Sequence, residues 1–237
     1  MVRATHFDVR PGTVLTVLAG YNVAQNVLLT KRGYVPGNLV MTGIGLGWAR
    51  SSGLTWSEVG LSRRDLAAGL KLGTGIAAGA AALAFLIRDQ RWALALIDDE
   101  TLTELSGREH VLRPLVRYPL GTALFEEVWF RGLLSAALRR HGVRHPGVVS
   151  STAFAAWHLI PTARAISANR AGRTLGREHK AMLVGAGSLA AGIAGLGFDR
   201  TRQISSSLAA PWLAHATFNS LGHWVAVRVR RSVRSTQ

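Results

Sequence analysis

Apolar residues are gathered into runs along the chain, separated by polar, arginine-bearing stretches. Most of these runs cover roughly 16 to 24 residues, about the length that crosses a hydrocarbon core of about 30 Å as a helix. The pattern predicts an all-α fold, a polytopic transmembrane helical bundle of about six to eight helices. The predicted spans are Val14–Leu29, Leu39–Trp48, Leu70–Ile87, Leu115–Leu138, Val148–Ile160, Met182–Phe198 and Leu208–Val227.

One of these spans and several segments between them have a less definite hydrophobic pattern. The span at Leu39–Trp48 is short and rich in glycine, so it is either re-entrant or merely hydrophobic. Trp92–Ile97 is too short to cross and suits an interfacial segment. Ser51–Gly73 is either an amphipathic segment at the interface or an ordinary loop, and Ser167–Lys180 is expected to be a surface loop.

Composition supports a membrane protein with one integral domain over residues 1–237. The mean hydropathy is +0.19 and charged residues make up 17%, which is unusual for a soluble protein. The N-terminus resembles a signal peptide but lacks a small-residue cleavage site, so we expect an uncleaved first span. Small residues in runs such as GTGIAAGAAALA indicate close helix packing rather than a nucleotide-binding loop, because no strand precedes them.

The net charge of +15 raises the question of nucleic acid. The basic residues lie mainly between and after the apolar runs, as is typical of contacts with anionic membrane lipids, and no nucleic-acid-binding motif accompanies them. We expect lipids and a membrane-associated substrate as partners, no nucleic acid, and a cytoplasmic C-terminal tail. Abundant arginine, alanine and glycine indicate GC-rich coding DNA, hence a bacterial plasma membrane.

The stretch LFEEVWFRGLL sets charged residues inside an apolar segment. Glu127 and Arg131 are four residues apart, acidic residue first, and so form a favourable pair on one helix face. Glu126 is rotated from Glu127 by about 100°, so this pair leaves it without a partner. An ionisable group at that depth is a functional candidate.

Two later spans offer partners for Glu126. FAAWH places Phe154 and His158 one helical turn apart, and HATFN does the same for His215 and Asn219. If the helices converge, Glu126 alone or with His158 can take a proton from water, while His215 and Asn219 donate hydrogen bonds to the oxyanion. Such a cluster can hydrolyse an amide without a nucleophile from the protein. The absence of cysteine excludes a thiolate nucleophile.

Together these motifs resemble those of the CPBP family of intramembrane glutamic proteases, also called the CAAX protease, bacteriocin-processing or Abi family. They are EExxxR, FxxxH and HxxxN, in this order, over about residues 120–221. The resemblance implies an all-helical membrane endopeptidase in which Glu126 and His158 activate water and His215 and Asn219 stabilise the oxyanion.

Whether the site binds a metal is a separate question, because members of the family have often been described as metalloproteases. No HExxH string is present, and Asn219 is a poor metal ligand but a good oxyanion donor. We therefore expect no cofactor. In the metal-dependent alternative, a divalent ion such as zinc would be held by Glu126, His158 and His215.

Structural roles compete with catalytic ones. Glu127 and Arg131 are expected to form a structural ion pair, and Phe154 to pack and to orient His158. Either histidine alone would suit a buried neutral imidazole, but the joint occurrence of the motifs favours catalysis. The predicted function is intramembrane endopeptidase. The alternatives are a non-catalytic membrane scaffold or bacteriocin self-immunity protein, and an ion or proton transporter.

Overall fold

The computed structural model describes residues 8–28, 32–88, 105–168 and 170–234, and all of its regular structure within these ranges is helical. The predicted all-α bundle is confirmed. The helices before and after the central one are α1 (Pro11–Val27), α2 (Tyr34–Ser51), α3 (Arg63–Ile87), α8 (Pro146–Trp157), α9 (Leu159–Ala168), α10 (Arg170–Thr174), α11 (Arg177–Ser205) and α12 (Ala209–Arg234).

One long helix between residues 107 and 140 forms the centre of the bundle. It consists of α5 (Gly107–Leu112), η2 (Arg113–Ala123), α6 (Leu124–Glu126), η3 (Glu127–Leu134) and α7 (Ser135–Arg140). The two η segments are π-helical, a winding that is rare and frequently found at functional sites. From Phe125 in α6 through η3 to Leu138 in α7, the residues of the central helix are buried without interruption.

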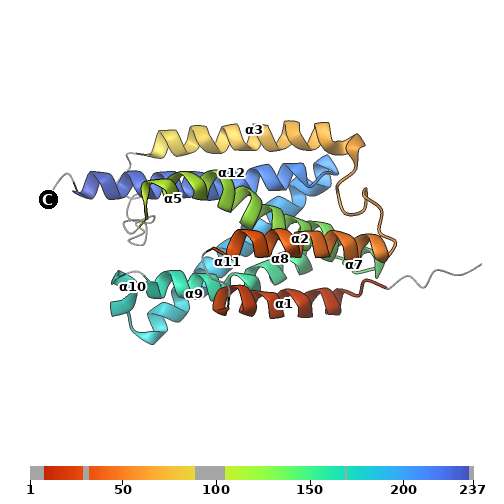
Figure 1. Cartoon of the computed structure of the whole chain (residues 1–237), viewed down its shortest axis with the longest axis horizontal. Coiled ribbons are helices and arrows are strands. Elements are labelled where there is room, and N and C mark those ends of the chain that lie inside the picture. The colour runs from red at the N-terminus through yellow and green to blue at the C-terminus, as the bar shows by residue number, and fades with distance from the viewer. Residues whose placement is uncertain (1–7, 29–31, 89–104, 169, 235–237) are drawn as a thin grey trace, which may run out of the picture.

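The other helices surround this central one (Figure 1). α3 lies along α12 at one edge of the bundle, and α8 packs against α11. Glycines allow the close approach of α8 and α11, since a Cβ at Gly192 would lie 2.9 Å from that of Ala155. Small residues in these runs therefore serve helix packing, as the sequence predicts.

Prolines explain the irregular winding of η2. Pro119 has no N–H, so it cannot bond to the carbonyl of Pro114 one π-turn earlier. Ser220 on α12 donates to that carbonyl instead, at 2.9 Å. Trp212, also on α12, donates through Nε1 to the Pro119 carbonyl at 2.8 Å. These two bonds to proline carbonyls attach the central helix to α12, and the Pro119 carbonyl also accepts from the Leu124 N–H.

The described parts of the predicted spans are helical to within one residue at their ends, with Val148–Ile160 divided between α8 and α9 at His158. Three expectations about shorter segments need correction or completion. Leu39–Trp48 is part of the 18-residue helix α2 rather than a short re-entrant piece. Ser51–Gly73 is divided, because the Ser62 hydroxyl accepts from the Arg64 N–H and starts α3 there. Most of the expected loop Ser167–Lys180 is helical, in α9, α10 and the start of α11. Trp92–Ile97 lies outside the described residues.

Two of the described helical segments, Arg63–Leu86 and Arg177–Ser205, are long and apolar enough to cross a membrane by length and composition. The other predicted spans are shorter, less apolar or more charged: α1 has 17 residues, α12 contains His215, Asn219 and His223, and the central helix contains the EExxxR charges. The multi-pass arrangement therefore remains a prediction.

The connection between α2 and α3 is held by three arginines from later in the chain. Arg202 donates to the carbonyls of Ser57 and Glu58, and Arg139 also donates to Glu58 O. Arg140 donates to the carbonyls of Ser52 and Gly53 and pairs with the Glu58 carboxylate at 3.1 Å. We call residues 52–62 with these side chains the arginine clamp.

Candidate active site

The two adjacent glutamates lie where α6 gives way to η3, at the most enclosed part of the central helix. Glu126 is 4% exposed and Glu127 is fully buried. The neighbouring aromatic residues Phe125, Trp129 and Phe130 are each at most 1% exposed. Charges in such surroundings are stable only when they are paired and hydrogen-bonded.

Glu127 is the centre of a buried ionic network. Its Oε1 accepts from Arg131 NH1 at 3.2 Å, which is the pair expected from the four-residue spacing. The same oxygen accepts from Nδ1 of His215 at 2.8 Å. The Arg131 guanidinium carbon lies 4.1 Å from the centre of the Phe154 ring. Glu127 therefore orients a histidine as well as neutralising an arginine.

Gly195 on α11 leaves the space that the Arg131 side chain needs. A Cβ at this position would lie 2.8 Å from Arg131 NH2 and 3.1 Å from the Phe154 ring. The glycine-rich pattern of α11 thus contributes directly to the geometry of the site.

Glu126 has different partners from its neighbour. Its Oε1 accepts from the indole Nε1 of Trp157 at 3.0 Å. Its Oε2 lies 3.6 Å from Nε2 of His215 and makes no hydrogen bond to a described residue. One carboxylate oxygen is therefore held in place while the other remains available.

His215 connects the two glutamates. Because Nδ1 donates to Glu127, the ring is held with Nε2 directed toward Glu126. The ring also stacks on Phe198 of α11, with centroids 4.8 Å apart and planes at 15°. The hydrogen bond to Glu127 and the stacking on Phe198 therefore both fix the orientation of the His215 ring.

His158 lies at the break between α8 and α9. Pro161 cannot donate to the carbonyl of Trp157, which instead accepts from the Asn22 side chain of α1 at 2.8 Å. The Nδ1 atom of His158 is 2.8 Å from the Phe154 carbonyl, to which it donates. Nε2 is then left as the acceptor of a neutral imidazole. The Phe154 and His158 rings are 4.4 Å apart, as the predicted FxxxH face requires.

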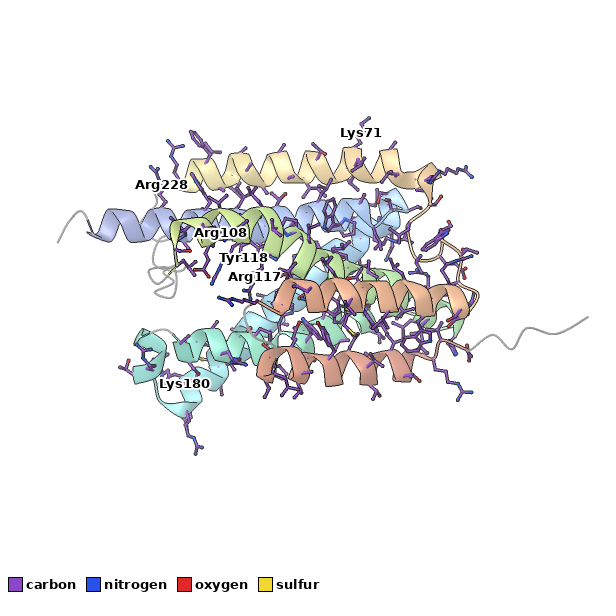
Figure 2. The ribbon with its side chains drawn as sticks, viewed as in Figure 1. Lys71, Arg108, Arg117, Tyr118, Lys180 and Arg228 are labelled. Carbon is purple, nitrogen blue, oxygen red and sulfur yellow. The ribbon has the colours of Figure 1, made fainter. Side chains whose placement is uncertain are left out.

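A cavity of about 580 Å³ brings the predicted catalytic residues together. Glu126, His158, His215 and Asn219 all line it, and the Asn219 amide makes no hydrogen bond to another described residue. We call this the polar cavity. Its wall also carries Arg117 and Tyr118, which lie in Figure 2 between the α12 side and the α9–α10 side of the bundle.

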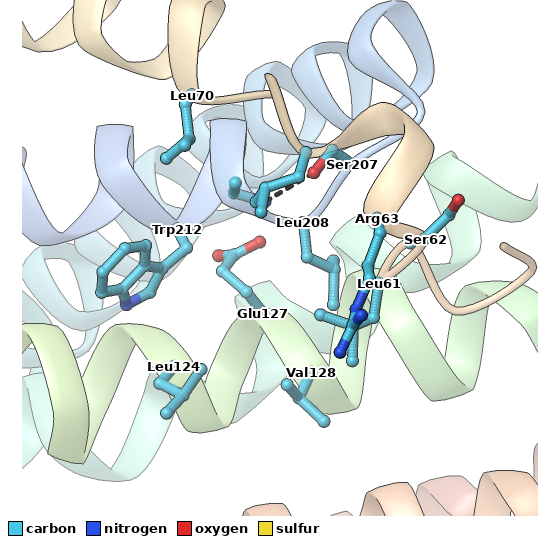
Figure 3. Close-up of a pocket in the computed structure, with 13 residues that line it drawn as sticks. Leu61, Ser62, Arg63, Leu70, Leu124, Glu127, Val128, Ser207, Leu208 and Trp212 are labelled. Carbon is cyan, nitrogen blue, oxygen red and sulfur yellow. Dashed lines mark hydrogen bonds between the residues drawn. The ribbon is translucent and has the colours of Figure 1, made fainter. Parts of the chain in front are cut away.

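A second space of about 310 Å³ lies on the other side of the glutamates and is lined mainly by leucines, Val128 and Trp212 (Figure 3). Glu127, rather than Glu126, faces it. We call this the apolar pocket.

Comparison with known protein families gives one match that agrees with this geometry. Residues 109–221 match the family described as type II CAAX prenyl endopeptidase Rce1-like. This segment is therefore similar to the CAAX protease family. Neither the curated proteins nor the solved structures that were compared gave a match.

The matched segment of the CAAX protease family starts earlier than the predicted core at about residue 120, and so includes most of the central helix. It contains all seven motif residues: Glu126, Glu127, Arg131, Phe154, His158, His215 and Asn219. The family is membrane-embedded and its members are CAAX-type endopeptidases. The match does not extend to the bacteriocin-processing and Abi names or to a metalloprotease description.

Within the described ranges, no group of three or more His, Asp or Glu side chains is placed so that it could hold a metal ion. Glu126, His158 and His215, the ligands of the metal-dependent alternative, are not brought together as such a group.

Sequence reasoning missed several residues of the site. Trp157 stands inside FAAWH, directly before the histidine, but only its hydrogen bond to Glu126 identifies it. No sequence motif identifies Arg117 and Tyr118. The π-helical winding of η2 directs them to the polar cavity, and the sequence pattern does not predict this winding. Tyr118 is 3.2 Å from His223 Nδ1, which lies two turns after His215 on α12.

Proposed function

We propose that this protein is an intramembrane endopeptidase that hydrolyses peptide bonds with a water molecule activated by Glu126. The observation that carries the proposal is the convergence of Glu126, His158, His215 and Asn219 on one polar cavity. These residues come from three separate parts of the chain, and each exposes a chemically complementary group to the same volume.

In the proposed reaction, Glu126 Oε2 accepts a proton from a water that also donates to His158 Nε2. The water oxygen forms a bond with the carbonyl carbon, and the carbonyl oxygen becomes an oxyanion. Asn219 and the Nε2–H of His215 donate hydrogen bonds to it. As the C–N bond breaks, the amine nitrogen takes the proton from Glu126.

The network around Glu127 supports these roles by holding His215 in one orientation. If Arg131 and His215 are both protonated, their two positive charges balance the two carboxylates. A neutral network tolerates burial far better than a single charge does. Glu127 and Arg131 are thus positioning residues, and Phe154 packs between Arg131 and His158.

For the substrate, we propose the C-terminal segment of a membrane-associated protein, in keeping with the CAAX name of the family. Arg117 and Arg164 both line the polar cavity, and a guanidinium binds a carboxylate in bidentate geometry. A free C-terminal carboxylate would therefore be attracted to this wall. We further propose that the protein crosses a bacterial plasma membrane several times.

The test is cleavage of a quenched-fluorescent peptide library by the purified protein in lipid bilayers. Wild type is compared with Glu126→Gln and His158→Ala, each with and without chelator. Loss of activity in both variants, without an effect of chelator, is the expected result, and chelator sensitivity would contradict the metal-free mechanism. If both variants retain wild-type turnover, the catalytic assignment fails and the scaffold or self-immunity function takes its place.

A further inference from the structure

The apolar pocket is a separate space from the polar cavity. It lies between α3, the start of α12 and the central helix, and its wall includes Leu66, Leu124 and Trp212. Its volume of about 310 Å³ is at the lower end of the range of small-molecule sites, about 300 to 1,000 Å³. Nothing in the proposed hydrolysis uses it.

One polar atom in this wall has no partner. Glu127 uses Oε1 for both Arg131 and His215, and its Oε2 is buried without a hydrogen bond to any described residue. Figure 3 shows the Glu127 carboxylate directed toward the pocket, with Trp212 on one side of it. A buried acceptor without a donor is unfavourable, so a ligand that carries a donor to this point would be stabilised.

The charge of the ligand's head group determines which donor suits Glu127 Oε2. A carboxylate head group would be repelled by Glu127. An ammonium would add a further positive charge beside Arg131 and near Arg63, which lines the same pocket, and its desolvation is costly. A neutral hydroxyl provides the hydrogen bond without either penalty.

The apolar pocket also has an entrance lined by apolar side chains. Leu66 and Leu70 of α3 line it, and they are 46% and 41% exposed. An alkyl chain that extends from the pocket would follow these side chains to the outer surface of α3, which belongs to a helix long and apolar enough to cross a membrane.

We propose that the apolar pocket binds a neutral single-chain alcohol, whose hydroxyl donates to Glu127 Oε2 and whose alkyl chain lies along Leu66, Leu70 and Trp212. This site is separate from the site of peptide hydrolysis, because the ligand and the scissile bond occupy different spaces. It would exist even in a protein without peptidase activity.

The experiment measures quenching of Trp212 fluorescence in detergent micelles by ω-bromoundecanol. The Trp212→Phe variant gives the quenching of the other tryptophans, which is subtracted. Bromoundecane and ω-bromoundecanoate at alkaline pH are the matched probes without the hydroxyl and with a negative head group. We expect saturable quenching by the alcohol at a concentration about tenfold lower than for either probe, the minimum effect of a hydrogen bond to a charged group.

Pocket-filling variants locate the probe. Leu70→Phe and Ala209→Leu add volume inside the pocket, whereas Leu83→Phe makes the matched change on an exposed part of α3. The half-saturating alcohol concentration should rise at least fivefold in each filling variant that keeps a cooperative unfolding transition, and should not change in Leu83→Phe. Equal quenching by bromoundecane, stronger quenching by the acid, or no effect in the folded filling variants would overturn the proposal. The comparison of the three probes requires only Trp212→Phe, and no pocket-filling variant, to fold.

Discussion

Glu126 and Glu127 are neighbours in the sequence, yet they face two different environments. Glu126 is on the polar cavity, with histidines, an asparagine and arginines around it. Glu127 is on the apolar pocket, and its charge is balanced from behind by Arg131 and His215. Burial alone therefore does not identify a catalytic carboxylate. Glu127 is the more deeply buried of the two, and it is also the one with the more complete set of ionic partners.

The largest expected difference between the two glutamates is in stability. Glu127→Gln leaves Arg131 buried without its ionic partner, and we expect a loss of about 3–5 kcal/mol in the free energy of unfolding. Glu126→Gln keeps the acceptor for Trp157 and should cost about 1 kcal/mol or less. Denaturant titration in micelles measures both, and a larger loss for Glu126→Gln would reverse the assignment of the structural partner.

The polar cavity should respond strongly to loss of the Asn219 amide. Asn219→Ala removes a proposed oxyanion donor, so kcat should fall about 10²- to 10³-fold, or about 2.7–4 kcal/mol, with little change in unfolding. Phe218→Leu, at the neighbouring and 47% exposed position, is the matched control. Equal rates for the two variants would remove Asn219 from the mechanism.

A smaller effect is expected from the indole that holds Glu126. Trp157→Phe keeps an aromatic ring against Phe125 and Phe130 but deletes the donor to Glu126 Oε1. A hydrogen bond to a charged group contributes about 1.5–3 kcal/mol, so turnover should fall by about tenfold or more. Trp56→Phe, at a 45% exposed position, should leave turnover unchanged. If it lowers turnover as much as Trp157→Phe does, the Trp157 indole acts only through packing and not through its bond to Glu126.

The smallest effect concerns an ion pair at the surface of the arginine clamp. Arg140→Ala removes an ion pair to Glu58 whose side chains are 35% and 39% exposed. Exposed pairs contribute about 1 kcal/mol or less, so the unfolding midpoint should shift only slightly, and less at high salt. A loss as large as that of Glu127→Gln would mean that the arginine clamp, and not the buried network, dominates stability.

The motifs predicted the helices and the members of the site better than they predicted its connections. Four-residue spacing is enough to place Glu127 beside Arg131 and Phe154 beside His158, because these contacts are local. The bond from His215 to Glu127 and that from Asn22 to Trp157 depend on how separate helices meet, which no local pattern encodes. The π-helical segment η2 contains Pro114 and Pro119, whose carbonyls accept from α12, and Arg117 and Tyr118 of the same segment line the polar cavity.

The arginine clamp also has a consequence for the order in which the chain is made. Residues 52–62 leave the ribosome long before Arg139, Arg140 and Arg202, whose side chains bind their carbonyls. At about 5–20 residues per second, the connection between α2 and α3 waits roughly seven to thirty seconds for Arg202. The N-terminal helices are therefore made before the contacts that fix their junction exist, and the last of these contacts forms only after Arg202 has been synthesised.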